Sequence, residues 1–345
     1  MVACPERLHV MNEEFLPGTM GSAGNYSRRA FLGRVGTLTA AAISTQLARV
    51  SADEPPAQFV EKPCNLVLLP CGRRLAYAEF GDPKATQTIL LFHGVPSCRL
   101  EGVAHLTALR QQPGVRLLGV DRPGFGLSDP AADIRFAAWS NDIAALADAL
   151  DIKQFSLMAF SGGAPYALAV AHAMPERVKA VALGCPMAPV EAADTTGSGG
   201  ASGAWFAEQH PVLARVALNH FINGMRRNPR RIPFSRFMGA SERRFLANPE
   251  IHKLFVQITC EACRQGPAEV CRGGAVLVQP WARWLGNVKQ KVAIFQGCSD
   301  EVVTPNMARY LAAALPNAEL HLFEGDGHMS VGWHRSAEIV KAALG

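Results

Sequence analysis

Three residues whose side chains can together carry out acyl transfer lie far apart along the chain: Ser161, Asp300 and His328. A serine hydroxyl is a poor nucleophile at neutral pH, so a base must take its proton as it attacks a carbonyl carbon. Imidazole suits this task because its reference pKa is about 6.5. A carboxylate can hold the imidazole in the useful tautomer and stabilise the imidazolium that forms. We therefore predict Ser161 as the nucleophile, His328 as the base and Asp300 as the acid.

The residues around Ser161 are typical of a sharp turn between a strand and a helix. The apolar segment 155–160 changes at Ser161 to a run of small residues, Gly162-Gly163-Ala164. The pattern Ala-x-Ser-x-Gly is close to the G-x-S-x-G nucleophile elbow. Strand and helix backbones nearly touch at such a turn, so the residues two before and two after the nucleophile must be small. Ala159 replaces the first glycine and still meets this requirement.

Asp300 and His328 each follow a segment predicted to be a short strand, over 292–296 and 319–323 respectively. Both residues are therefore expected in loops beyond the carboxyl ends of strands, at the edge of the sheet that carries Ser161. Open α/β sheets bind their ligands at this edge. The chain order Ser, Asp, His is the order of α/β-hydrolases and differs from the orders of the two well-known serine protease folds.

Other carboxylates are weaker candidates for the acid. Asp326 and Glu324 are too close to His328 along the chain to lie easily behind its ring. Some members of this fold carry the acid after the strand that follows the nucleophile helix, predicted here over 178–185. In this chain no carboxylate follows that strand until Glu191.

A candidate oxyanion hole follows the predicted strand 88–92, in the sequence His93-Gly94-Val95-Pro96. In acyl transfer, two backbone N–H groups hold the developing oxyanion, one after the nucleophile and one from the loop after the third strand. We predict that Gly162 and Val95 supply them. His93 is interpreted as a residue that braces this loop rather than as a second base.

Together with the segment Asp121-Arg122-Pro123-Gly124-Phe125-Gly126-Leu127-Ser128-Asp129, these motifs resemble the α/β-hydrolase superfamily, in its branch with H-G-x-P after the third strand. The similarity runs from about residue 66 to the C-terminus and is interrupted between about 187 and 285. It implies a mostly parallel eight-stranded sheet flanked by helices, with a helical cap inserted after the sixth strand. Related haloalkane dehalogenases and epoxide hydrolases have aspartate as the nucleophile, so the serine argues against those activities. The chemistry requires no cofactor and no metal.

A chain of 345 residues that is 49% hydrophobic can form one large α/β domain with an insertion. We predict an export leader over 1–52, the core over 53–187 and 287–345, and the helical cap over 188–286. Expected core elements are a hairpin over 66–69 and 73–80 and helices over 136–150, 164–173, 306–315 and 331–344. Expected cap elements are a flexible stretch over 196–203 and helices over 205–218, 241–245 and 251–264.

The predicted leader contains Ser27-Arg28-Arg29-Ala30-Phe31-Leu32-Gly33, which resembles a twin-arginine export signal. The apolar stretch 35–47 that follows is too short and too interrupted to span a membrane stably. Val50-Ser51-Ala52 offers small residues for cleavage. We expect export through the twin-arginine machinery to the periplasm or the exterior. The alternative is a cytoplasmic protein with an ordinary N-terminal amphipathic helix.

The net charge of +5 is modest, but arginines cluster between residues 226 and 244. We interpret this cluster as a solvated helical face, with attraction of an anionic substrate or membrane surface as the alternative. No interleaved aromatic residues or nucleic-acid module accompany it, so no nucleic-acid partner is expected.

Eight cysteines follow the predicted leader, and this even number permits disulfides without assigning any. Cys185 and Cys298 are interpreted as packed thiols. A zinc site is disfavoured because its potential ligands do not have a standard spacing; these are His252, Cys260, Cys263 and Cys271.

The favoured function is a serine hydrolase that cleaves an ester, thioester or small amide of a small-molecule substrate. A ligand-binding or sensor protein with weak catalysis is one alternative, and a C–C bond hydrolase or perhydrolase shares the same triad. A proline-iminopeptidase-like peptidase needs an acidic site for a free amino group, which the arginine-rich cap supports poorly. Aromatic cap residues are expected either in the pocket wall or in the core of the cap: Trp205, Phe206, Phe221, Trp281 and Trp284. The sequence leaves the oligomeric state open.

Overall fold

A computed structural model describes residues 64–82, 84–233, 235 and 238–345, so the predicted export leader lies outside the described residues. An eight-stranded sheet forms the centre of the described part, in the order β1-β2-β4-β3-β5-β6-β7-β8. The strands are β1 (Asn65–Leu68), β2 (Arg74–Gly81), β3 (Gln87–Phe92), β4 (Val115–Val120), β5 (Phe155–Phe160), β6 (Val178–Gly184), β7 (Lys291–Gly297) and β8 (Ala318–Phe323).

The sheet has the predicted mixed topology. The hairpin β1–β2 is antiparallel, and β2 pairs antiparallel with β4. From β4 across to β8 all neighbouring strands are parallel. The carboxyl ends of these parallel strands therefore meet at one edge, where the loops carrying the candidate site residues begin.

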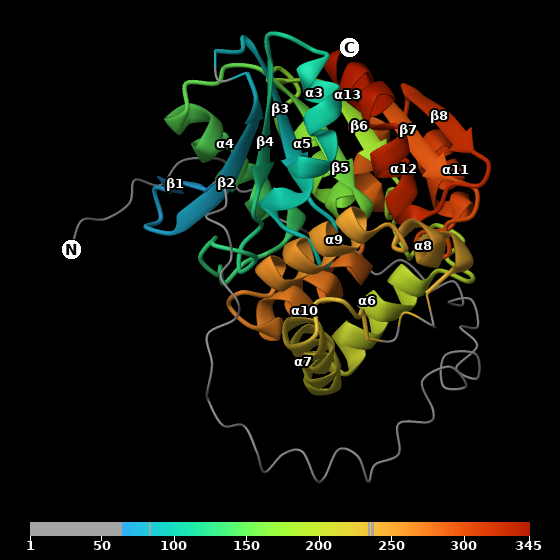
Figure 1. Cartoon of the computed structure of the whole chain (residues 1–345). Coiled ribbons are helices and arrows are strands. Elements are labelled where there is room, and N and C mark those ends of the chain that lie inside the picture. The colour runs from blue at the N-terminus through green and yellow to red at the C-terminus, as the bar shows by residue number, and fades with distance from the viewer. Residues whose placement is uncertain (1–63, 83, 234, 236–237) are drawn as a thin grey trace, which may run out of the picture. The chain divides into compact units, whose positions relative to one another are not determined.

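Helices cover both faces of the sheet (Figure 1). One face packs against α3 (Leu106–Arg110) and α13 (Ser336–Leu344), and the other against α4 (Phe136–Ala149), α5 (Ala164–Ala173) and α11 (Pro305–Ala314). All residues of β5 are buried because its alternate side chains enter these two separate apolar clusters. This explains why the sequence of β5 is apolar at nearly every position instead of alternating between apolar and polar residues.

The segment between β6 and β7 forms a group of helices next to the carboxyl edge of the sheet (Figure 1). The helices are α6 (Gly199–Gln209), α7 (Pro211–Arg227), α8 (Ala240–Phe245), α9 (Pro249–Ala262) and α10 (Pro267–Ala275). Short 3-10 turns, η4 (Val276–Val278) and η5 (Ala282–Asn287), lead from them to β7. Ile222, Met225 and Val256 of these helices share an apolar cluster with Leu100 and Phe125 of the core, so the insertion packs directly on the sheet domain.

The structure corrects three predicted elements. The stretch 196–203 is not flexible throughout, because α6 already begins at Gly199. Ser198 Oγ accepts the N–H of Ala201, and this N-cap helps the helix to begin within a glycine run. The single helix predicted over 205–218 is two, α6 and α7, separated at His210 before the proline that opens α7.

The third correction concerns the C-terminal helix predicted over 331–344. It is also two helices, α12 (His328–His334) and α13, separated at Arg335. The sequence prediction did not include the 3-10 turn η1 (Arg99–His105), α3 or α10. Within the described part of the chain, no helix is both long enough and apolar enough to cross a bilayer.

Candidate active site

Ser161 lies where β5 ends and the 3-10 turn η2 (Ser161–Gly163) begins, immediately before α5. Its φ of 51° is in the left-handed region, which a residue with a side chain adopts only under strain. The turn is crowded, because a Cβ atom on Gly163 would overlap the carbonyl oxygen of Phe92. A Cβ on Gly94 would lie 3.2 Å from the Cβ of Ser161. The small residues around the serine therefore follow from close backbone approach.

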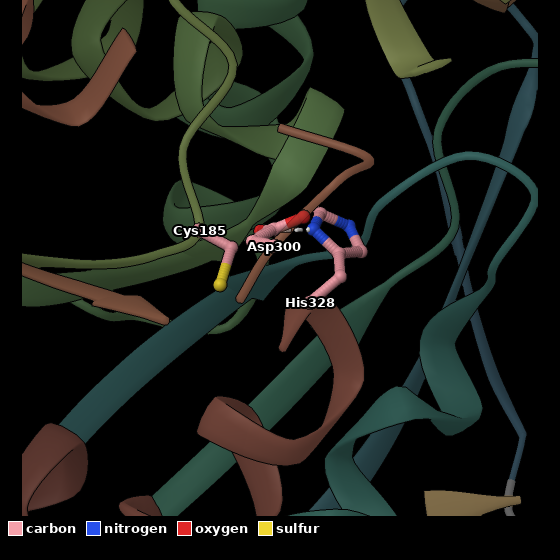
Figure 2. A group of neighbouring side chains, drawn as sticks. All are labelled: Cys185, Asp300 and His328. Atoms are coloured by element: carbon pink, nitrogen blue, oxygen red, sulfur yellow. Dashed lines mark hydrogen bonds and ion pairs between the residues drawn. The ribbon is translucent and has the colours of Figure 1, made fainter. Parts of the chain in front are cut away.

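Asp300 lies in the loop after β7, whereas His328, expected in a loop after β8, is the first residue of α12. Their side chains are in contact (Figure 2). The Nδ1 of His328 is 2.8 Å from Oδ2 of Asp300. The other carboxylate oxygen accepts the N–H groups of Val302 and Val303 at 2.8 and 2.9 Å. Gln296 donates its Nε2 to Oδ2 at 3.1 Å. With four hydrogen bonds and only 3% exposure, the carboxylate of Asp300 is held in one position.

The electrostatic surroundings favour a charged imidazole at His328. Burial lowers the pKa of His328, but the negative charge and hydrogen bond of Asp300 raise it, and Glu242 and Glu101 raise it further. The net result is a pKa above the usual value of 6.5. An ionised Asp300 can only accept, so Nδ1 carries the proton and Nε2 is the nitrogen that can take one.

The rival acid Asp326 is engaged elsewhere. Its carboxylate bonds the Nδ1 of His334 at 2.7 Å and pairs with Arg335 at 3.3 Å. The structure therefore places Asp300, and not Asp326, beside the imidazole of His328.

Cys185 lies beside Asp300 and His328, with potential ligand atoms of all three within 4.8 Å of one another (Figure 2). Burial raises the pKa of the Cys185 thiol well above its usual value, and its Sγ donates to the carbonyl oxygen of Gly327 at 3.9 Å. The neutral, buried thiol fits the predicted packing role. Among the described residues, the disfavoured zinc ligands do not form a metal-binding group. No disulfide joins any of the eight cysteines of the described part.

The loop before Val95 is braced from both sides. The N–H of Gly94 donates to Oε2 of Glu101 at 3.1 Å, and its carbonyl oxygen accepts Nη2 of Arg122 at 2.9 Å. His93 accepts the backbone N–H of Arg122 through Nε2 at 3.1 Å. Burial and the nearby Arg122 lower the pKa of His93 well below 6.5, so the ring is neutral and suited to this bracing role. A Cβ on Gly162 would lie 3.4 Å from Val95, so the two predicted oxyanion residues are neighbours.

A cavity of about 370 Å³ lies between these loops and the helices of the insertion. Ser161, His328 and Val95 all border it. Most of its wall is apolar and aromatic, including Phe221, Phe245, Phe255, Ile258, Met329 and Trp333.

The structure decides between pocket wall and core for several of the aromatic residues for which both positions were expected. Of the five aromatic residues considered for the wall, Phe221 borders the cavity, whereas Trp281 is fully buried in the core and Trp205 is 37% exposed. The arginine cluster contributes none of the residues that border the cavity in the described structure.

A model of the alpha/beta hydrolase family matches residues 89–342. The chain belongs to the alpha/beta hydrolase family. A poly(3-hydroxyalkanoate) depolymerase from Ectopseudomonas oleovorans is 25% identical over 267 residues, covering 72% of this chain and 80% of the relative. A 2-hydroxymuconate semialdehyde hydrolase from Pseudomonas putida is 26% identical over 271 residues, covering 74% of this chain and 86% of the relative.

Solved structures agree with this alpha/beta hydrolase fold. A hydrolase from Pseudomonas aeruginosa PA01 superposes with a TM-score of 0.60 at 18% identity, covering 83% of this chain and all of its own. A thermophilic esterase from Thermogutta terrifontis gives a TM-score of 0.59 at 18% identity, covering 84% of this chain and 98% of its own. The predicted fold is confirmed, and family and relatives together support a hydrolase.

In this alpha/beta hydrolase the structure joins Asp300 to His328 and places Ser161 on the wall of the same cavity. No hydrogen bond within 3.5 Å links Ser161 Oγ to the imidazole among the contacts of the described residues. Catalytic hydrogen bonds are often long before substrate binds and tighten in the complex. Glu101, Arg122, Gln296 and Glu242 support the site but were not recognised from the sequence.

Proposed function

We propose that this alpha/beta hydrolase cleaves carboxylic esters, and related thioesters or small amides, through an acyl-enzyme formed on Ser161. One observation carries the proposal. Ser161 occupies a strained turn on the wall of an apolar cavity, and the same wall holds an imidazole that is oriented by a buried carboxylate.

Each group has a defined role in the proposed reaction. Nε2 of His328 takes the proton of Ser161 Oγ as the oxygen attacks the carbonyl carbon, and Asp300 stabilises the resulting imidazolium. The N–H groups of Val95 and Gly162 hold the oxyanion. The imidazolium then protonates the departing alcohol, and a water molecule, activated in the same way, releases the acid. Removing one donor from an oxyanion hole costs about 3–4 kcal/mol of transition-state stabilisation in enzymes where this has been measured.

The cavity wall indicates the kind of substrate. Aromatic and aliphatic side chains surround the site, and burial of apolar surface contributes about 25 cal/mol per Å² to binding. We therefore propose an apolar acyl or alkoxy chain of several carbons rather than a charged group. The similarity to a 2-hydroxymuconate semialdehyde hydrolase favours C–C bond hydrolysis as the second candidate activity.

Ser161→Ala tests the proposal with p-nitrophenyl esters from acetyl to long acyl chains. We expect turnover by the parent enzyme with a preference for chains longer than acetyl. S161A should fall to the rate of the uncatalysed reaction while its circular dichroism spectrum stays unchanged. Undiminished turnover by S161A would reject the proposal. Stoichiometric labelling of Ser161 by a fluorophosphonate, without steady-state turnover of any ester, would favour a sensor protein instead.

We also propose that the enzyme is exported by the twin-arginine route, supported by the Ser-Arg-Arg segment at 27–29 and the apolar stretch after it. Cell fractionation should find the processed enzyme outside the cytoplasm. Replacing both Arg28 and Arg29 by lysine should keep it inside. Equal export of the parent and of the double lysine variant would contradict this route.

A further inference from the structure

We propose that Glu242, which the insertion contributes from α8, is a positioning residue that fixes the catalytic imidazole of His328 through the backbone of α12. The inference rests on the proposed function, because it assigns to His328 the role of base. It adds a residue of the cap to the machinery that holds this base.

The contact is direct and buried. Oε1 of Glu242 accepts the backbone N–H of His328 at 2.6 Å, and Oε2 accepts the N–H of Met329 at 3.2 Å. Glu242 is only 1% exposed. Figure 1 shows α8 lying next to α12, although the two helices are far apart in the sequence. A carboxylate in this position satisfies two N–H groups that the first turn of a helix leaves without partners.

The neighbouring residue of α8 reaches the loop that carries the acid. Ser241 Oγ donates to the carbonyl oxygen of Ser299, the residue before Asp300, at 3.2 Å. Two consecutive residues of the cap therefore contact both the loop that carries Asp300 and the first turn of α12, where His328 lies. The fit leaves no room for a side chain at Gly327, where a Cβ would overlap Ser241 and Glu242.

Glu242 also contributes charge to the imidazole. Three carboxylates face His328: Asp300 after β7, Glu242 on α8 and Glu101 on η1. Each raises the pKa of His328 against the effect of burial. Burial raises the pKa of Glu242 itself, whereas the nearby His328 lowers it. Glu242 is therefore placed to act on His328 in two ways, by orienting its backbone and by stabilising its charged form.

Two substitutions separate these effects. Glu242→Gln keeps the shape of the side chain but removes its charge. It also replaces one of the two accepting oxygens by an NH₂ group, which then faces the backbone N–H of His328 or Met329. Glu242→Asp keeps the charge but withdraws the carboxylate by one methylene group. Glu250→Gln is the matched control, because Glu250 is an exposed glutamate at the start of α9 in the same cap.

The experiment measures kcat, KM and the pH dependence of kcat/KM with the p-nitrophenyl ester that the parent turns over best. For E242Q we expect kcat to fall about 10- to 100-fold, the loss typical of a misplaced catalytic group, with little change in KM. The acid limb of the kcat/KM profile of E242Q should move to lower pH, because the charge of Glu242 no longer raises the pKa of His328. E242D should lose kcat but keep the pH profile of the parent. E250Q should match the parent in all three measurements.

Several outcomes would overturn the inference. A kcat and pH profile of E242Q equal to those of E250Q would do so, as would reduced thermal stability without any change in the pH profile. If E242Q does not fold, E242D decides, and a kcat equal to the parent's rejects the positioning role. If the parent shows no turnover, the proposed function fails, and NMR titration of His328 remains as the test. An unchanged titration in E242Q then rejects the inference as well.

Discussion

Asp300→Asn is the perturbation whose effect follows most fully from the structure. Asp300 accepts four hydrogen bonds, two at each oxygen. An asparagine has only one side-chain oxygen. If that oxygen stays with the N–H groups of Val302 and Val303, its NH₂ group must face Gln296 and His328. The imidazole can then pair with it only by accepting through Nδ1, which moves the ring proton to Nε2.

An imidazole protonated at Nε2 cannot remove the proton of Ser161. In serine proteases the equivalent change lowers turnover by about 10⁴, which corresponds to about 5.4 kcal/mol of activation free energy. We expect a loss of this size in kcat for D300N. The direction of the pH effect also follows. Burial lowers the pKa of His328 and Asp300 raises it, so the acid limb of kcat/KM should move to lower pH in D300N.

The assay compares kcat and pH profiles of the parent, D300N and Asp326→Asn. Asp326 is the matched control because it is a buried carboxylate in the same region that bonds His334 rather than His328. D326N should retain turnover within a few-fold. The reasoning is refuted if D300N stays within tenfold of the parent, or if D326N loses as much activity as D300N.

Two predictions concern stability. Gly163→Ala should destabilise the fold strongly or prevent its formation, because the new Cβ would overlap the carbonyl oxygen of Phe92. Gly203→Ala, in α6, places its Cβ where no other atom is near. It should raise the free energy of unfolding measured in urea by about 0.5–1 kcal/mol. Equal changes in the free energy of unfolding for the two glycine substitutions would contradict the packing argument. Burial lowers the pKa of His105 to about 4. As the pH falls, the imidazole of His105 is therefore protonated in the unfolded chain before it is protonated in the folded one. The free energy of unfolding should fall by about 3 kcal/mol between pH 6.5 and 4 for this reason. His105→Gln should lose less stability than the parent between pH 7 and 4.5 in urea titrations, and an identical loss would show that His105 does not carry this effect.

The sheet and the candidate triad could be predicted because their signals are local. The run of β5 is apolar at every position except Ser156, and it ends abruptly at small residues that a crowded turn requires. The shared position of Asp300 and His328 could be predicted because each follows a segment typical of a short strand, apolar in β7 and alternating in β8. The carboxyl ends of parallel strands meet at one edge of a sheet.

The supporting residues could not be predicted because their roles depend on distant contacts. Glu242 stands in the sequence as a lone acid among arginines, yet it binds a backbone N–H 86 residues away. The glycine-rich sequence at the start of α6 indicates flexibility by composition. In the structure, the N–H groups of Gly199 and Gly200 donate to the carbonyl oxygens of Glu301 and Val302, and this tertiary contact overrides the low helix propensity of glycine.

The most direct test of the central claim is the site of covalent labelling by an alkyl fluorophosphonate, mapped by peptide mass spectrometry. The account predicts one adduct per chain, on Ser161, formed in parallel with loss of esterase activity, and much slower labelling of a His328→Gln variant. Full loss of activity with the adduct on another residue, or labelling of H328Q as fast as the parent, would contradict it.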